Sequence, residues 1–167
     1  MNSIDKINKL SKPDFISIFG NIFEKTKWIA QKSYDSKPYK NYDELFLKMI
    51  EIFDNTNKEN HLKILNAHPD LAVEKKLTKD SKNEQKNASL NQCTSEEFIE
   101  FKKLNEEYKV KFGFPFIVAV KGKNKEEILN SFRQRITNNI NLEFEEAKRQ
   151  VKKIASFRLS EIIKSII

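Results

Sequence analysis

The sequence predicts an all-α fold, a single-domain helical bundle over residues 1–167 with one extended Gly-Phe-Pro-Phe connector. Three observations lead to this prediction. Apolar residues recur at helical spacing through most of the chain. Four segments begin with Ser, Thr or Asn and carry an acidic side chain three residues later, which is typical of a helix N-terminus. With 3 Gly and 4 Pro in 167 residues, the chain is too poor in turn residues for a β-sandwich.

Two helical segments are predicted in the first 40 residues. Ser11, with Asp14 three residues later, marks the start of the first, and Gly20 indicates a break or a close packing contact. The second segment, residues 24–30, contains the only tryptophan, Trp28. The apolar positions of the first run are Phe15, Ile16, Phe19, Ile22 and Phe23.

The middle of the chain is predicted to form a capped helix, a short helix and a long polar loop. Asn41 with Glu44 caps the first of these, and residues 61–66 form the short helix, which stops before Pro69. Residues 75–92 have little apolar periodicity and predict a loop with a turn or two of helix. The apolar face of the capped helix consists of Leu45, Phe46, Met49, Ile50 and Phe53.

Two further helices flank the predicted connector. Thr94 with Glu97 opens one of them, and Asn124 with Glu127 opens the other. The connector, residues 113–120, is predicted to be buried and extended because it is rich in aromatic and β-branched side chains.

The last predicted helix, residues 142–163, has an arginine within its apolar stripe. Arg158 lies four residues after Ile154 and four before Ile162, so it shares their face of the helix. A guanidinium there must reach back to solvent, pair with a buried carboxylate, or point into a pocket that binds an anion. All three arrangements are compatible with the spacing.

The composition excludes several classes of protein. One cysteine excludes a disulfide framework and a cysteine-based zinc site, and 3 glycines are too few for a glycine-rich phosphate loop. The longest apolar run, residues 116–120, is far shorter than the roughly 20 residues of a membrane span. We see neither a secretory signal nor a C-terminal Ser-Lys-Leu, so we expect a soluble protein of a reducing compartment, the cytoplasm.

The positive charge does not favour a nucleic-acid partner. The chain has 31 Lys and Arg against 24 Asp and Glu, a net +7, but only four of the basic residues are arginines. Lysines interleaved with acids are typical of solvated faces, and a mildly positive field also suits a small anionic substrate. The alternative is a non-catalytic basic helical module for an acidic partner or nucleic acid, whose binding would be salt-sensitive.

His68 is the first residue in a chemically distinctive setting. It directly precedes Pro69, which biases its backbone toward an extended conformation at the end of the predicted helix. There the imidazole can face a cleft and exchange protons, or it can stabilise the helix C-terminus as a cation. His61, seven residues earlier, is predicted at the surface, and this separation is too long for the usual i, i+4 metal pair.

Two further segments matter in combination with His68. Glu84 offers a carboxylate for hydrogen bonding or proton transfer, and Gln85 offers an amide that donates and accepts; by itself this stretch is a solvated turn. Pro115 limits regular hydrogen bonding, so nearby backbone N–H groups can meet a ligand. The alternative for Pro115 is a buried connector without a ligand.

Six groups of residues form one ordered pattern: Phe23-Glu24 with Trp28-Ile29-Ala30; His68-Pro69-Asp70-Leu71-Ala72; Ser81 with Glu84-Gln85 and Leu90; Phe101 through Leu104-Asn105 and Tyr108 to Phe112-Gly113-Phe114-Pro115-Phe116; Arg135 with Asn138; and Ile154 with Arg158-Leu159. Over residues 15–163 this pattern resembles the family of 2-oxo-4-hydroxy-4-carboxy-5-ureidoimidazoline (OHCU) decarboxylases.

The resemblance implies an all-helical homodimer that needs neither a metal nor an organic cofactor. It implies a carboxy-lyase that decarboxylates OHCU, a small ureido-imidazoline, stereoselectively to (S)-allantoin in urate breakdown. His68 would be the catalytic imidazole, with Glu84 as the second catalytic side chain. The implied substrate-binding residues are Gln85 and Glu84 at the ureido or ring groups, Arg158 at an anionic part, and Pro69, Ser81, Phe116, Ile117, Val118 and Ala119 along the pocket.

The chain departs from the family at two positions. Ser89 and Val73 each stand where the family often has Gly. We expect both to change the backbone of a loop rather than the chemistry. A related possibility is that this fold acts on a different ureide-like acid.

Overall fold

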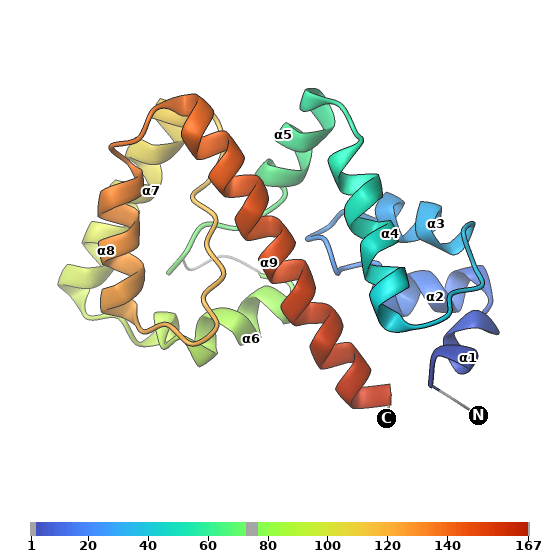
Figure 1. Ribbon diagram of the computed structural model, residues 1–167. Coiled ribbons are helices and arrows are strands. Elements are labelled where there is room, and N and C mark those ends of the chain that lie inside the picture. Colours follow the sequence, from blue (N-terminus) through green and yellow to red (C-terminus); the bar gives the residue numbers. More distant parts are fainter. Residues whose placement is uncertain (1–2, 73–76, 167) are drawn as a thin grey trace. The chain divides into compact units, whose positions relative to one another are not determined.

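A computed structural model of the chain describes residues 3–72 and 77–166, and all regular secondary structure in these residues is helical. The chain divides into two compact units: unit 1 is Met1–Ala67 with Lys152–Ile167, and unit 2 is His68–Val151. The long helix α9, Ile140–Ile166, contributes to both units (Figure 1). Among the described residues, none of the helices is long and apolar enough to cross a membrane. The predicted all-α fold is confirmed.

Unit 1 contains five helices before α9 enters it: α1 Ser3–Asn8, α2 Lys12–Phe19, α3 Lys27–Tyr34, α4 Tyr42–Asp54 and α5 Lys58–Asn66. The hydroxyl of Ser11 and the side-chain amide of Asn41 cap α2 and α4, as the sequence predicts. Helix α2 packs against α3, and α3 packs against α4. The core of this unit includes Phe15, Phe19, Leu45, Met49 and Phe53, all at most 1% exposed.

Gly20 ends α2 and also permits a close approach, so both predicted roles are observed. It is the C-cap residue, and a Cβ added there would lie 2.4 Å from the carbonyl oxygen of Ile16. The next helix begins at Lys27, three residues later than the sequence suggested, because residues 20–26 form turns.

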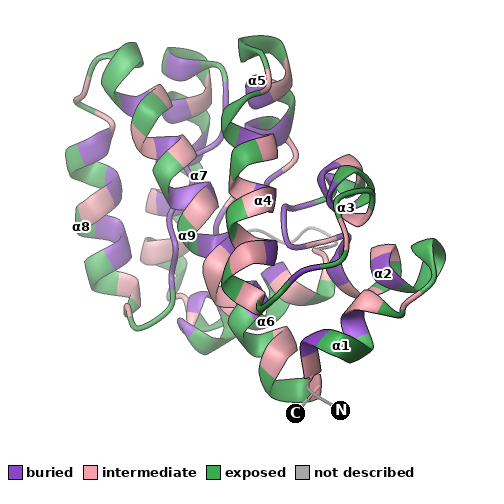
Figure 2. Ribbon diagram, turned by 45° about the vertical axis from the view of Figure 1, so that its right-hand side comes forward, coloured by how far each residue is buried: buried purple, intermediate pink, exposed green. Residues whose placement is uncertain are grey.

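Unit 2 contains α6 Lys79–Asn87, the short 3₁₀ helix η1 Leu90–Gln92, α7 Ser95–Phe112 and α8 Lys125–Arg135. Thr94 and Glu97 form a complete capping box at α7, and Asn124 caps α8. Helix α7 packs against α8, on which buried and exposed bands alternate (Figure 2). Between α7 and α8, residues 114–120 lie in neither helix nor strand, and every one of them is buried.

The prediction of a loop with a turn or two of helix over residues 75–92 underestimates the helix, because α6 has nine residues and η1 has three. The sequence of α6 is polar throughout and has no apolar period to show its length. The cap of α6 is Thr78, whose hydroxyl accepts from the amide of Ser81. Helix α1 is not predicted at all, although its Ile4 and Ile7 are buried. Residues 75–76 of the predicted loop, and Val73, lie outside the described residues.

Ser89 has a backbone conformation that favours glycine. Its φ is +62°, in the left-handed region, at the turn between α6 and η1. A residue with a Cβ is strained there by about 1 kcal/mol, whereas glycine is not. The departure from the family's frequent Gly therefore has a cost in stability.

We expect Ser89→Gly to raise the free energy of unfolding by about 0.5–1 kcal/mol, because relief of strain exceeds the added flexibility of the unfolded chain. Urea unfolding followed by circular dichroism measures this change. Ser131→Gly, in the interior of α8, is the control and should destabilise the protein by a similar amount. A loss of stability in Ser89→Gly would contradict the prediction.

Candidate functional site

His68 lies directly after helix α5 and is buried. Helix α5 ends at Asn66, Ala67 is its C-cap residue, and His68 follows with 8% of its surface exposed. Pro69 and Asp70, which come next, are half-buried. The imidazole is thus carried on a non-helical segment, residues 68–72, which opens unit 2.

Three side chains hold this His68 segment. Gln85 of α6 donates to the carbonyl of Asp70 over 3.2 Å and accepts from the amide of Ala72 over 3.0 Å. Asn105 of α7 donates to the carbonyl of Leu71 over 3.0 Å. In addition, the ammonium of Lys109 pairs with the Asp70 carboxylate at 2.6 Å. Both polar atoms of the Gln85 amide are therefore engaged with the segment that carries His68.

The backbone of the His68 segment is strained at the peptide to which Gln85 and Asn105 are hydrogen-bonded. Ala72 has a φ of +53°, a conformation that costs an alanine about 1–2 kcal/mol. Such a conformation persists only where surrounding contacts impose it, and it is common at functional sites. Here Gln85 and Asn105 supply the constraining contacts on either side of the Leu71–Ala72 peptide.

Helix α6 presents three of the predicted site residues on one face. Ser81, Glu84 and Gln85 are spaced i, i+3, i+4, so they are neighbours along the helix surface. Ser81 and Gln85 are buried and Glu84 is half-buried. Because Gln85 bonds to Asp70 and Ala72, this face of α6 lies against the His68 segment.

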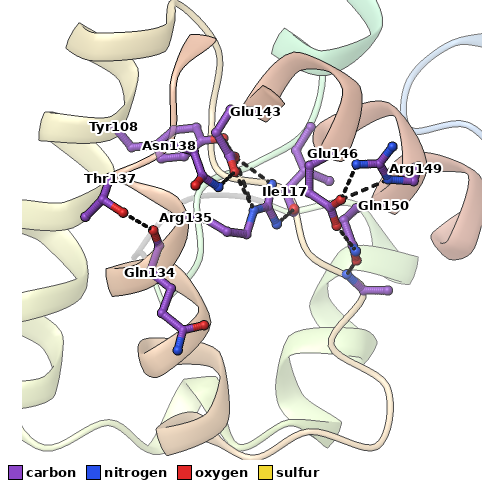
Figure 3. Close-up of polar contacts among 11 residues, drawn as sticks. Tyr108, Ile117, Gln134, Arg135, Thr137, Asn138, Glu143, Glu146, Arg149 and Gln150 are labelled. Carbon is purple, nitrogen blue, oxygen red and sulfur yellow. Dashed lines mark hydrogen bonds and ion pairs between the residues drawn. The ribbon is translucent and has the colours of Figure 1, made fainter. Parts of the chain in front are cut away.

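The predicted pocket backbone is held by two side chains of unit 2 (Figure 3). Arg135, at the end of α8, donates to the carbonyl of Ile117 over 2.6 Å. Gln150 of α9 accepts from the amide of Ala119 over 2.9 Å. The ring of Phe116 lies 4.4 Å from the guanidinium carbon of Arg135. The connector is therefore fixed by side chains rather than by a strand partner.

Glu143 is the buried anion at the centre of this arrangement. It is 0% exposed, and it accepts from Nε and Nη2 of Arg135 at 3.0–3.1 Å and from the amide of Asn138 at 3.0 Å. The hydroxyl of Tyr108 also donates to it. Burial, and then this hydrogen bond, raise the pKa of Tyr108 far above its usual value, so the phenol remains a donor.

Arg158 lies in unit 1, and it pairs with a buried carboxylate. Its Nη2 donates to Glu24 over 2.7 Å and its Nη1 donates to the carbonyl of Asn21 over 2.8 Å. Arg158 is 5% exposed and Glu24 is 0% exposed. Of the three arrangements open to an arginine in an apolar stripe, the structure has the buried ion pair.

The prediction that His61 lies at the surface is wrong. It is 6% exposed; its Nε2 lies 2.7 Å from the carbonyl oxygen of Phe53, and its ring packs 5.0 Å from the ring of Phe53. Helix α5 begins at Lys58, so His61 falls on the same face as the buried Ile64 and Leu65. Because the predicted helix began at His61 itself, the prediction did not recognise that His61 shares a face with Ile64 and Leu65.

Unit 1 also has a surface cavity of about 280 Å³, between Tyr39 and helix α4. None of the predicted site residues lines it, so we do not place the predicted chemistry there. Within the described part of the chain, no cluster of three or more His, Cys, Asp or Glu side chains is arranged to hold a metal ion.

Four buried polar residues of unit 2 have no role predicted from the sequence: Asn105, Arg135, Glu143 and Gln150. The signal was available, because each lies within the apolar stripe of its helix. Arg135 is seven residues after Ile128 and three after Phe132, which is the same spacing argument that singled out Arg158.

Comparison with known proteins gives a consistent family. A family model described as OHCU decarboxylase matches residues 8–160. The "Uric acid degradation bifunctional protein" of Bacillus sp. (strain TB-90) is 40% identical over 98% of this chain, which spans only 33% of that protein. The 2-oxo-4-hydroxy-4-carboxy-5-ureidoimidazoline decarboxylase of Haloferax volcanii is 34% identical over 95% of both chains. A crystal structure of (S)-allantoin synthase matches with a TM-score of 0.74 and 27% identity, over 95% of this chain and 53% of that one.

We expect Asn105→Leu to lower the free energy of unfolding by about 1–3 kcal/mol, because the buried carbonyl of Leu71 loses its donor. Urea unfolding measures the loss, and amide hydrogen exchange should increase in residues 70–72. The control is Asn83→Leu on the exposed side of α6, where we expect a change within about 0.5 kcal/mol. Equal effects of the two substitutions would refute the role given to Asn105.

Proposed function

Because the chain belongs to the OHCU decarboxylase family, we propose that it decarboxylates OHCU stereoselectively to (S)-allantoin, without a cofactor, in urate breakdown. The observation that carries this proposal is the buried His68 on a segment that Gln85 and Asn105 hold in a strained conformation. Support also comes from the Haloferax volcanii relative, which is named for this activity and matches along nearly its whole length.

The reaction makes modest demands on the protein. The bond between the ring carbon and the carboxylate breaks, CO₂ leaves, and the electron pair passes into the adjacent unsaturated C=N bond of the ring, whose nitrogen takes up a proton. The hydroxyl on the carbon that lost CO₂ then gives up its proton and becomes a carbonyl, and a proton adds to the neighbouring carbon, which bears the ureido group. The protein must therefore orient the substrate, stabilise the developing negative charge and deliver one proton from one side.

His68 is the group that we propose exchanges this proton. Imidazole is the side chain that gains and loses a proton most readily near neutral pH. Because His68 is buried and its segment is clamped from α6 and α7, its ring can approach the substrate from one direction. Protonation of a single face of the carbon that bears the ureido group then sets the handedness of the product.

Glu84 is the proposed second catalytic residue, from the face of α6 that lies against the His68 segment. A carboxylate accepts hydrogen bonds from the N–H groups of a ureido substituent and so orients it. Ser81 and Pro69 would line the same pocket. For Gln85, the hydrogen bonds to Asp70 and Ala72 favour action through the His68 segment; direct contact with the substrate stays a prediction.

The remaining expectations of the resemblance stay proposals. Arg158 would bind an anionic part of the substrate, while Glu24 balances its charge within unit 1. We propose that residues 1–167 form one functional domain, because the family match includes residues of both units and α9 runs through both. The homodimer and the cytoplasmic location also stay predictions.

We expect the chain to accelerate formation of optically active allantoin when OHCU is generated from urate and followed by circular dichroism. His68→Ala and Glu84→Ala should each lower kcat/KM by about 10²–10⁴-fold, because each removes a group that handles or orients the proton. The folded fraction of every variant is checked by far-ultraviolet circular dichroism in the same buffer.

Two matched controls separate chemistry from folding. His61→Gln removes the other buried histidine, and Glu106→Ala removes an exposed carboxylate of α7. Both should retain the activity of the original chain per folded molecule. A rate no faster than spontaneous decay of OHCU would exclude the proposal, and thermal shifts with related ureides would then test a different ureide-like acid. Salt-sensitive binding of nucleic acid that does not depend on His68 would instead favour the basic module.

A further inference from the structure

We propose that Arg135 and Gln150 are positioning residues that aim the backbone of Val118 at the substrate. This inference rests on the proposed function, in which residues 116–119 line the pocket. It assigns a role to Arg135, which the sequence pattern included without a function, and to Gln150, which it did not include.

The starting point is how the connector is held. Residues 114–120 are buried yet form neither helix nor strand, so no regular ladder fixes their peptide groups. Around Val118, the side-chain hydrogen bonds to the backbone are that from Arg135 to the Ile117 carbonyl and that from the Ala119 amide to Gln150. These two bonds therefore decide the orientation of the two peptide planes that flank Val118.

Because peptide groups are planar and trans, these two hydrogen bonds fix the directions in which the N–H and C=O of Val118 point. In a trans peptide the C=O and the N–H point to opposite sides. Because the Ile117 carbonyl points at Arg135, the N–H of Val118 points away from Arg135. Because the Ala119 N–H points at Gln150, the C=O of Val118 points away from Gln150.

Val118 consequently presents one donor and one acceptor, and neither has a hydrogen-bond partner in residues 3–72 and 77–166. A buried peptide group without a partner is costly, so a ligand with complementary groups would be favoured. An acceptor and a donor close together are what an N–H and C=O of a ureido or cyclic amide group require. The chemistry of the proposed substrate therefore matches this pair.

The orientation of Arg135 is itself over-determined. Its Nη1 donates to the carbonyl of Ile117, and its Nε and Nη2 donate to the buried Glu143 (Figure 3). Its guanidinium carbon also lies 4.4 Å from the centre of the Phe116 ring. A lysine ammonium is a single point and cannot occupy these directions together. The side chain of Gln150 is oriented likewise, because its Nε2 donates to Glu146 over 2.9 Å and leaves the oxygen for Ala119.

Helix α8 offers two control residues next to Arg135. Arg133 lies two residues before Arg135 but faces solvent, where it pairs with Glu100. Gln134 is exposed between them. Substitution of Arg133 and Gln134 removes a guanidinium and a side-chain amide, as in the tested pair, but leaves the hydrogen bonds to residues 117 and 119 in place.

The test compares Arg135→Lys and Gln150→Leu with Arg133→Lys and Gln134→Leu in the OHCU assay, at a temperature where circular dichroism shows each variant folded. We expect KM to rise about tenfold or more in the first pair, because the donor and acceptor of Val118 are misdirected. In the second pair KM should stay within about twofold, as for other exposed positions. Loss of folded protein alone would lower the apparent kcat and leave KM unchanged.

Gln150→Leu removes no charge, so it decides the matter if Arg135→Lys does not fold. A KM unchanged in Gln150→Leu, or in both variants of the first pair, overturns this inference while the proposed function stands. An original chain that does not accelerate the reaction overturns the proposed function, and this inference with it.

Discussion

The carboxylate of Glu143 is fully buried and surrounded by donors from α7, α8 and the turn that precedes α9. Burial of an uncompensated charge costs several kcal/mol, so a cation beside Glu143 stabilises unit 2 strongly, and Arg135 supplies it. Once Arg135 is there, its remaining N–H groups have a fixed direction, and the Ile117 carbonyl accepts from one of them. The conformation of a connector without secondary structure thus follows from the neutralisation of one buried anion.

The segment that carries His68 is also held by buried polar side chains of neighbouring helices, but Gln85 and Asn105, which bond to its backbone, are neutral. Gln85 and Asn105 satisfy backbone atoms of residues 70–72 that a helix or strand would otherwise satisfy. In both cases a helix supplies a buried polar side chain to a segment that is not helical. Irregular backbone can then carry chemistry while the helices around it remain ordinary.

The fold could be predicted well from the sequence because apolar periodicity and N-caps are local signals. Ser11, Asn41, Thr94 and Asn124 all cap the helices expected of them. Helix α6 could not be predicted by the same rule, since its few buried side chains, Ser81 and Gln85, are polar and give no apolar period. The partners of buried polar residues were equally out of reach: Glu143 lies 35 residues from Tyr108, and only the tertiary structure brings them together.

The arginines of this chain are few, and each of them pairs with a glutamate. Arg133, Arg135, Arg149 and Arg158 bind Glu100, Glu143, Glu146 and Glu24, while most other cations are lysines on exposed faces. At the two buried positions, Arg135 and Arg158, the guanidinium donates to a carboxylate and to a backbone carbonyl at the same time, which the single point of a lysine ammonium does less well. These two arginines therefore mark the places in the fold where the shape of the cation matters as well as its charge.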